Sequence, residues 1–210
     1  MEWTIIIKQF IGLFAVIDPI GGVVFFIGLA GSRPIEERAK IAMGAVLTMG
    51  ITLIVAVLLG DKLLWFFGIS LFSFRVGGGI LILLTSIAML GGYAPSLRRT
   101  PQELLESEDK ASVAVVPLGI PFLAGPGAIT TAVISAQNAK LTADLGILIG
   151  IIVLIAAITF VIFLSSGPIS KVLGKTGMNI FTRLLGLLLA AISIEIIANG
   201  LKGLFPVLGH

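Results

Sequence analysis

Two acidic side chains stand out in this chain of 210 residues, because each interrupts a long apolar stretch. They are Asp18 and Glu195. A charged side chain at the centre of a bilayer costs about 2.5–3.5 kcal/mol on insertion scales, so each needs a partner, a proton or a function. Asp18 is suited to capping a helix, to holding a substrate ammonium group, or to binding a coupling cation or proton. The cost of burying Glu195 is removed by protonation or by a buried ion pair with Arg75 or Arg183. The more ordinary role of these two arginines is to extend their charged ends to a membrane interface.

Two motifs rich in proline and glycine predict breaks inside apolar helices. Asp followed by Pro, as at Asp18-Pro19, is typical of a helix start, with an N-cap and then the first helical position. Gly125-Pro126-Gly127 cannot hold a regular helix. A half-helix that starts inside the membrane presents N–H groups that suit a carboxylate, and the carbonyl groups before the break suit a cation or an ammonium group. The alternative is a pair of proline kinks with a structural role only.

The candidate substrate-binding residues therefore cluster at these two breaks. For the two threonines, hydrogen bonds to their own helix backbone are the competing explanation. The full set is Asp18, Pro19, Ile20, Gly21, Gly22, Gly125, Pro126, Gly127, Ala128, Thr130 and Thr131. Asp18, Glu195, Arg75 and Arg183 are the candidate coupling or structural charges.

Enzymatic and metal-dependent classes find little support in the sequence. The glycine-rich stretch at Gly125–Thr130 lacks the lysine that follows a phosphate-binding loop. A serine hydrolase in the membrane needs a histidine or lysine base, but the single histidine is His210 and no lysine lies at the centre of a span. There is no cysteine. We expect neither an enzyme nor a metal site nor a bound cofactor.

The composition places these residues in a membrane protein. The chain is 57% hydrophobic and 12% charged, whereas a soluble domain carries about 25% charged residues. A bilayer core requires about 20 apolar residues per helix. On that criterion the sequence predicts an all-α membrane protein with six transmembrane helices, at about 4–30, 39–60, 74–93, 113–138, 144–166 and 182–203.

The two halves of the chain resemble each other. Residues 14–22, around Asp18-Pro19, align with residues 121–129, around Gly125-Pro126, at an offset of 107 residues, and Phe72–Gly78 aligns with Ile180–Gly186 at an offset of 108. The alignment thus predicts two three-helix repeats, residues 1–105 and 106–210. The first repeat includes the start of a cytoplasmic loop at its end. Because three is odd, the second copy enters from the opposite side, which gives a 3+3 inverted repeat with discontinuous helices 1 and 4. Such repeats recur in secondary transporters.

The distribution of Lys and Arg predicts the orientation. The first, third and fifth loops hold about twice as many as the opposite side, so both termini are expected outside the cell and the loop Tyr93–Lys110 in the cytoplasm. Trp3 and Trp65 then fall at the outer interface. We expect a multi-pass protein of the cell inner (plasma) membrane, surrounded by lipid and without a nucleic-acid partner.

At these residues the sequence resembles the MarC family of prokaryotic membrane proteins, which includes the SnatA-type neutral amino acid transporters and belongs with the LysE-like exporter group. The resemblance lies in Asp18–Gly21, in Phe66–Ser70 leading to Phe74–Gly79, and in the pattern Pro117-x-x-x-Pro121-x-x-x-Gly125-Pro126-Gly127-Ala128-Ile129. It covers essentially the whole chain. Gly22 departs from the family, where Asn is frequent.

The resemblance implies a secondary transporter that moves small neutral amino acids such as glycine and alanine, driven by a gradient of H⁺ or Na⁺. The alternatives are an ion channel or metal-ion exporter of similar layout, an exporter of another small metabolite, and an assembly subunit without flux of its own. The sequence leaves the oligomeric state open, and a homo-oligomer is compatible with it.

Overall fold

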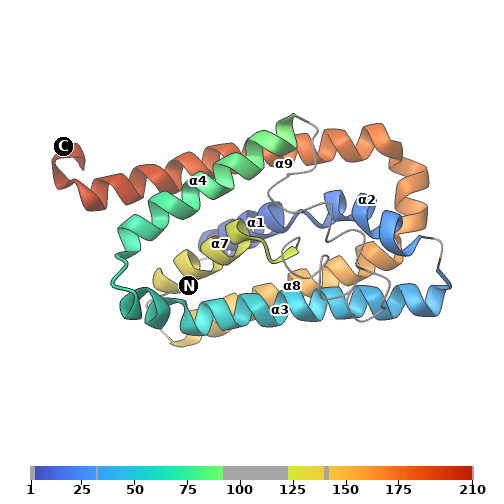
Figure 1. Ribbon diagram of the computed structural model, residues 1–210, viewed down its shortest axis with the longest axis horizontal. Coiled ribbons are helices and arrows are strands. Elements are labelled where there is room, and N and C mark those ends of the chain that lie inside the picture. Colours follow the sequence, from blue (N-terminus) through green and yellow to red (C-terminus); the bar gives the residue numbers. More distant parts are fainter. Residues whose placement is uncertain (1–2, 32, 92–122, 140–141, 210) are drawn as a thin grey trace.

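The computed structural model describes residues 3–31, 33–91, 123–139 and 142–209 (Figure 1). These residues form seven α-helices and one short 3₁₀ helix, without strands among them. The elements are α1 (Trp3–Ile17), α2 (Pro19–Ala30), α3 (Ile35–Phe66), α4 (Leu71–Leu90), α7 (Pro126–Gln137), α8 (Thr142–Leu164), α9 (Ser166–Leu204) and η3 (Pro206–Gly209).

Five helical stretches within the described residues are long and apolar enough to cross a bilayer. They are Trp3–Ala30, Ile35–Phe66, Leu71–Leu90, Ala143–Leu164 and Thr176–Leu204. They match the first, second, third, fifth and sixth predicted spans. The predicted fourth span, 113–138, lies outside the described residues up to residue 122, and α7 forms its second part. The helical membrane fold is confirmed, and the inverted repeat stays a prediction.

Two helices differ from their predicted bounds. Helix α3 extends past 39–60 in both directions, and Glu36 and Glu37 fall in its first turn, where acidic groups interact favourably with the helix dipole. Helix α9 begins at Ser166, so the loop expected before residue 182 is helical. Gly174 bends it with φ 60° and ψ −178°, a conformation open to glycine because it lacks a Cβ. Figure 1 shows the bend at the end where α8 joins α9.

The helices form three layers (Figure 1). One outer layer is the pair α4 and α9, the other is the pair α3 and α8, and α1, α2 and α7 lie between them. The contacts agree with this view: α7 packs on both α3 and α4, while α1 and α2 each pack on α8 and α9. The helices that flank the two breaks, α1, α2 and α7, thus occupy the interior, and α3, α4, α8 and α9 surround them.

Glycines let α4 and α9 pack closely and antiparallel. A Cβ on Gly186 of α9 would lie 2.9 Å from Cβ of Met89, near the end of α4. A Cβ on Gly203, farther along α9, would overlap the ring of Phe72, near the start of α4. Small residues at such interfaces allow backbones to approach in lipid. By contrast, a Cβ on Gly146 or Gly150 of α8 would meet no described atom within 4 Å. The close packing that this Gly-x-x-x-Gly spacing suggests is therefore not found among the described residues.

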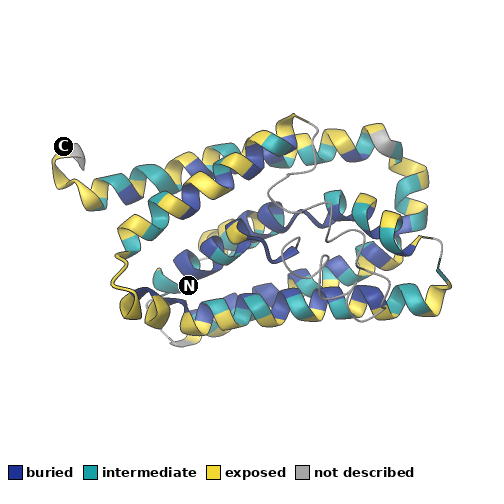
Figure 2. Cartoon of the chain, in the orientation of Figure 1, coloured by how far each residue is buried: buried dark blue, intermediate teal, exposed yellow. Residues whose placement is uncertain are grey.

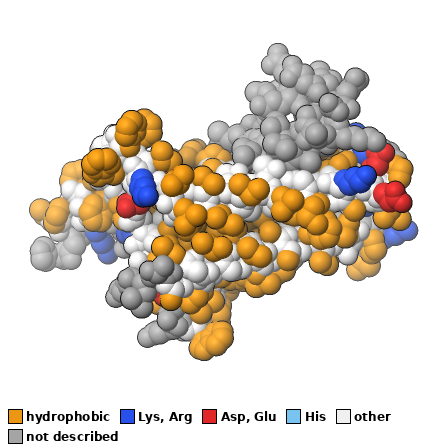
Figure 3. Space-filling model, turned by 90° about the horizontal axis from the view of Figure 1, so that it is seen from below, with side chains coloured by type: hydrophobic (Ala, Val, Ile, Leu, Met, Phe, Trp, Pro, Cys, Tyr) orange, Lys and Arg blue, Asp and Glu red, His pale blue; other side chains and the backbone are white. Residues whose placement is uncertain are grey.

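Burial follows the layers. Helix α7 and the last turns of α1 are mostly buried, the first half of α1 is largely exposed, and the outer helices alternate between buried and exposed faces (Figure 2). Many exposed side chains are large and apolar, for example Leu47, Ile51 and Leu187 at 54%, 61% and 62% exposure, as expected where lipid is the solvent. Figure 3 shows hydrophobic side chains over the middle of one face and charged side chains toward its two ends.

Candidate functional site

The first break is a single residue, Asp18, between α1 and α2. Its N–H donates to the carbonyl of Phe14 at 3.0 Å, which completes the last turn of α1. Its own carbonyl accepts from the N–H of Gly22 at 3.0 Å, so α2 begins at the same residue. Its backbone is left-handed, with φ 48° and ψ 63°. Few residues other than glycine adopt this region, although Asp and Asn do so more often than most. Asp18 is only 3% exposed, so a carboxylate is held inside the protein at a bend of the backbone.

Asp18 is the N-cap of α2, which confirms the capping role predicted from Asp-Pro. Its Oδ1 accepts a hydrogen bond from the N–H of Gly21 at 3.0 Å, and Pro19 occupies the first helical position. A Cβ on Gly21 would overlap Asp18 Oδ2. Glycine at position 21 therefore makes room for the carboxylate. Gly22 is buried and Ile20 is half-buried beside it.

The second break opens α7 at Gly125 and Pro126. Gly125 is buried and extended, with φ −68° and ψ 169°, and its carbonyl accepts from the N–H of Ile129 at 3.0 Å. No side chain among the described residues caps this helix. The N–H groups at the start of a helix lack partners within it. Those of Gly127 and Ala128 are therefore not bonded within α7.

The two breaks lie next to each other. A Cβ on Gly127 would lie 3.1 Å from Cγ1 of Val16, which is two residues before Asp18, and 3.3 Å from Cγ1 of Ile82 at the middle of α4. Helices α2 and α7 each have 12 residues, so each is about 18 Å long, slightly more than half of a hydrocarbon core of about 30 Å. The breaks therefore lie near the middle of the bundle.

The two threonines that follow the second break differ in their contacts. The Oγ1 of Thr131 donates to the carbonyl of Gly127 at 2.9 Å, so it bonds its own backbone. Thr130 is 3% exposed and packs on α4, where a Cβ on Gly78 would overlap its Cγ2 and lie 2.7 Å from its Oγ1. Of the other candidate residues here, Ala128 is buried and Pro126 is exposed.

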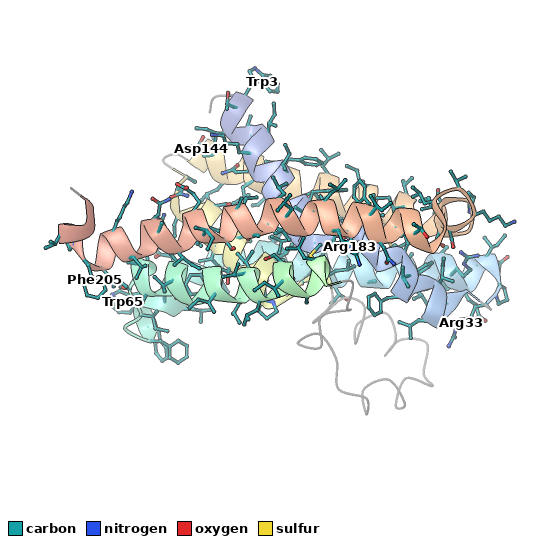
Figure 4. All side chains as sticks on the ribbon, turned by 90° about the horizontal axis from the view of Figure 1, so that it is seen from above. Trp3, Arg33, Trp65, Asp144, Arg183 and Phe205 are labelled. Carbon is teal, nitrogen blue, oxygen red and sulfur yellow. The ribbon has the colours of Figure 1, made fainter. Side chains whose placement is uncertain are left out.

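The remaining charges do not join this site. Arg75 donates from Nη2 to Oδ1 of Asn138 at 2.8 Å, which links α4 to the end of α7. Glu195 is exposed, and its Oε1 accepts from Nδ2 of Asn199 at 3.1 Å. The pairing of Glu195 with Arg75 or Arg183 is not found, because Glu195 lies on the outer face of α9. Arg183 is also exposed; Figure 4 labels it on α9.

Sequence reasoning missed a polar contact between α3 and α7. The Nε2 of Gln137 donates to Oδ1 of Asp61. Beside this contact, α3, α7 and α8 enclose a cavity of about 310 Å³. The adjacent charges Asp61 and Lys62 at the end of an apolar run are a sequence signal for a polar site, but such charges are also typical of the loop after a membrane span.

A second missed cluster lies at the other end of the bundle. The rings of Phe26 and Phe163 stack with centroids 4.7 Å apart, and both side chains are fully buried. The guanidinium of Arg38 lies 6.0 Å from the centroid of the Phe26 ring. Its Nη2 donates to Oγ of Ser166 at 2.7 Å.

Comparison with known proteins gives one family and several relatives over the full length. Residues 3–205 match the sequence model of a family described as "MarC family integral membrane protein". The "UPF0056 membrane protein YvbG" of Bacillus subtilis is 39% identical over 99% of this chain and 99% of its own length. The "UPF0056 membrane protein YhcE" of Escherichia coli is 36% identical, over 98% and 95% respectively. The "UPF0056 membrane protein MJ1677" of Methanocaldococcus jannaschii is 35% identical, over 97% and 98%. No solved structure matches the chain.

Proposed function

The chain belongs to the MarC family of integral membrane proteins, and from this premise we propose that it is a secondary active transporter of small neutral amino acids such as glycine and alanine. It works by alternating access, coupled to a gradient of H⁺ or Na⁺, without a prosthetic group or an enzymatic step. In this respect it resembles the SnatA-type members of the LysE-like group.

One observation carries this proposal: the start of α7 packs on the last turn of α1 at the middle of the bundle, two residues before the buried carboxylate that caps α2. In transporters built on discontinuous helices, the start of a half-helix holds an anionic substrate group near the midplane. In our proposal the N–H groups of Gly127 and Ala128 hold the substrate carboxylate. Asp18 holds its ammonium group or the coupling ion. The second break itself is built from Gly, Ala and Thr, with Val16 and Ile82 packed against Gly127, and this close packing favours small substrates.

The pattern of contacts supports the inverted repeat that alternating access needs. The half-helix α2 of the first repeat packs on α8 and α9 of the second, and α7 of the second packs on α3 and α4 of the first. Each broken helix thus lies against the long helices of the other repeat. Two repeats that exchange their broken helices in this way can rock against each other around a fixed central site.

The proposed orientation puts both termini outside the plasma membrane. Trp65 and Phe205 lie toward one end of the molecule and Arg33 at the other (Figure 4). Trp65 is 83% exposed, as expected for an aromatic anchor at an interface, whereas Trp3, 80% exposed, lies between the two ends in Figure 4. A reporter enzyme that folds only outside the cytoplasm tests this: it should be active when fused after the last residue. Activity only when it is inserted after Gly31 would reverse the orientation.

Transport is tested in proteoliposomes. The purified protein should accumulate labelled glycine or alanine under an imposed proton or sodium gradient, and unlabelled amino acid should exchange with the label. Flux of ions or metals that is independent of amino acids would instead favour the channel or metal-ion exporter. If no gradient drives uptake and no exchange occurs, the amino acid proposal is wrong.

A matched pair of variants locates the transport at the breaks. Gly127→Leu places a side chain against Val16 and Ile82, so we expect it to abolish uptake. Gly150→Leu makes the same change where no described atom lies within 4 Å, so it should transport like the wild type. Wild-type uptake by Gly127→Leu would remove the second break from the site.

A further inference from the structure

The cavity between α3, α7 and α8 lies at the level where the membrane begins. Between Lys40 and Asp61, α3 has an uncharged stretch, Ile41–Gly60, whose length of about 30 Å equals the thickness of a hydrocarbon core. Asp61 and Lys62 are exposed at the end of this stretch, so the cavity opens beside them at the membrane surface. Its lining residues are Val57, Leu58, Asp61, Lys62, Val133, Ala136, Gln137, Ala139 and Leu145.

The cavity also extends toward the central breaks. Val133, on its α7 side, is only 3% exposed and packs on α3, where a Cβ on Gly60 would lie 2.6 Å from its Cγ2. It lies about 12 Å along the helix from Gly125. A molecule in the cavity is thus about two helical turns from the proposed central site.

The equivalent place at the other end of the bundle is filled. The offset of 107 residues between the repeats takes Phe26 to Val133 and Arg38 to Leu145. Val133 and Leu145 both line the cavity. Their counterparts Phe26 and Arg38 belong to the stacked cluster, in which Phe26 packs on the fully buried ring of Phe163 and Arg38 bonds Ser166.

The same helix contacts are therefore open at one end of the molecule and closed by an aromatic stack at the other. In a transporter that alternates between two faces, this is the asymmetry expected of a state open to one side. This asymmetry favours the cavity as the entrance in this state.

We propose that this cavity is a first binding station for the zwitterion of a small α-amino acid on its way to the central site. The ammonium group of Lys62 binds the substrate carboxylate. The carboxylate of Asp61 binds the substrate ammonium, which takes the place of the Gln137 amide that now donates to Asp61. The volume of about 310 Å³ is at the lower end of the range of about 300–1,000 Å³ for ligand pockets, which favours small side chains. This inference rests on the proposed transport of neutral amino acids.

Because the chain has no cysteine, single cysteines report on the cavity without background. Ala136→Cys places a thiol in its wall. In the full-length protein in detergent, a cationic methanethiosulfonate reagent should modify this thiol, and glycine or alanine should slow the reaction. Propionate, which lacks the ammonium group, and ethylamine, which lacks the carboxylate, should not. Val207→Cys is the control, since Val207 is 84% exposed and lies outside the cavity.

Charge variants then identify the two binding groups. In the Ala136→Cys background, Lys62→Gln and Asp61→Asn should each raise the glycine concentration for half-protection about fivefold, as expected for one exposed ionic contact. Lys202→Gln, which removes an exposed cation near the end of α9 outside the cavity, should leave it unchanged. Equal protection by propionate and glycine, or no effect of Lys62→Gln and Asp61→Asn, would overturn the proposal.

The same preparations separate this inference from transport itself. Uptake in proteoliposomes without any protection of the Ala136→Cys thiol by glycine would leave the transporter in place and remove the entrance site. Protection without uptake would establish the zwitterion site and contradict the transporter. The absence of both would remove both.

Discussion

Asp18 combines two unusual properties, a left-handed backbone and a buried carboxylate. Asn is as good an N-cap as Asp and also tolerates the left-handed region. Asp18→Asn should therefore keep the fold, with an apparent melting temperature in detergent close to that of the wild type. If the negative charge couples transport to the ion gradient, this variant should still exchange labelled for unlabelled glycine but should no longer accumulate it.

Asp18→Ala is the contrasting variant. It loses the capping bond to Gly21, which costs about 1 kcal/mol, and it adds backbone strain of about 1 kcal/mol or more. Its melting temperature should fall. If Asp18→Asn accumulates glycine against the gradient like the wild type, Asp18 is a structural cap and the coupling ion binds elsewhere.

Gly21 gives a prediction about stability that does not depend on transport. Gly21→Ala would place its methyl group where Asp18 Oδ2 lies, so the cap must shift, and forcing a group into a packed site costs about 1–3 kcal/mol. Gly28→Ala makes the same change in the same helix with no described atom within 4 Å. Thermal unfolding of the purified variants should show a lower melting temperature for the first only. Equal melting temperatures would contradict the packing of Asp18 on Gly21.

Part of this site could be predicted from its residues. The pair Asp18-Pro19 predicted a capped helix start, because the chemistry of the cap depends on neighbours within one turn. The left-handed backbone of Asp18 and the contact of Thr130 with Gly78 were not predictable. The outward direction of Glu195 was also missed, since it depends on which face of α9 the other helices cover.

The glycine run on α4 shows how one element uses three neighbouring glycines differently. All three are helical. A Cβ on Gly78 would overlap Thr130 of α7, and a Cβ on Gly79 would lie 2.6 Å from Ile197 Cγ1 of α9, whereas a Cβ on Gly77 would meet no described atom within 4 Å. Gly78 and Gly79 therefore serve close packing against two different helices.

Neighbouring variants test this packing. Gly78→Ala should push α7, and with it the second break, away from α4, at a cost of about 1–3 kcal/mol. We expect a lower melting temperature and a raised KM for glycine. Gly77→Ala should change neither, apart from a small gain in helix stability. If both variants behave alike, Thr130 does not depend on the room left by Gly78.

Helix positions were predicted better than helix ends. Five predicted spans correspond to spanning helices because runs of about 20 apolar residues are a strong signal. The ends of α3 and α9 were placed too far inward, since a helix continues into polar residues wherever its backbone bonds can form. The kink at Gly174 replaces an expected loop for the same reason.

The arrangement of the whole molecule depended on information that hydropathy does not contain. Counting apolar runs gives the number of helices but not their neighbours. The placement of α1, α2 and α7 between two outer pairs involves contacts between residues far apart in the chain, such as Gly60 with Val133 and Gly127 with Val16. The repeat predicted equivalent helices, and the structure packs them as pairs, α4 with α9 and α3 with α8.

The central position of the broken helices has a consequence for synthesis. A ribosome makes α1 to α4 first, yet α1 and α2 pack mainly on helices that do not yet exist, namely α7, α8 and α9. Until those emerge, the broken helix that contains Asp18 lacks most of its protein neighbours, and irregular backbone exposed to lipid is costly. A fragment ending at Gly91 should therefore be degraded rapidly in cells, and co-expression with the remaining residues should extend its half-life in a pulse-chase experiment. A long-lived fragment would contradict this. The first half of the chain is thus exposed to membrane quality-control proteases until the second half has been made.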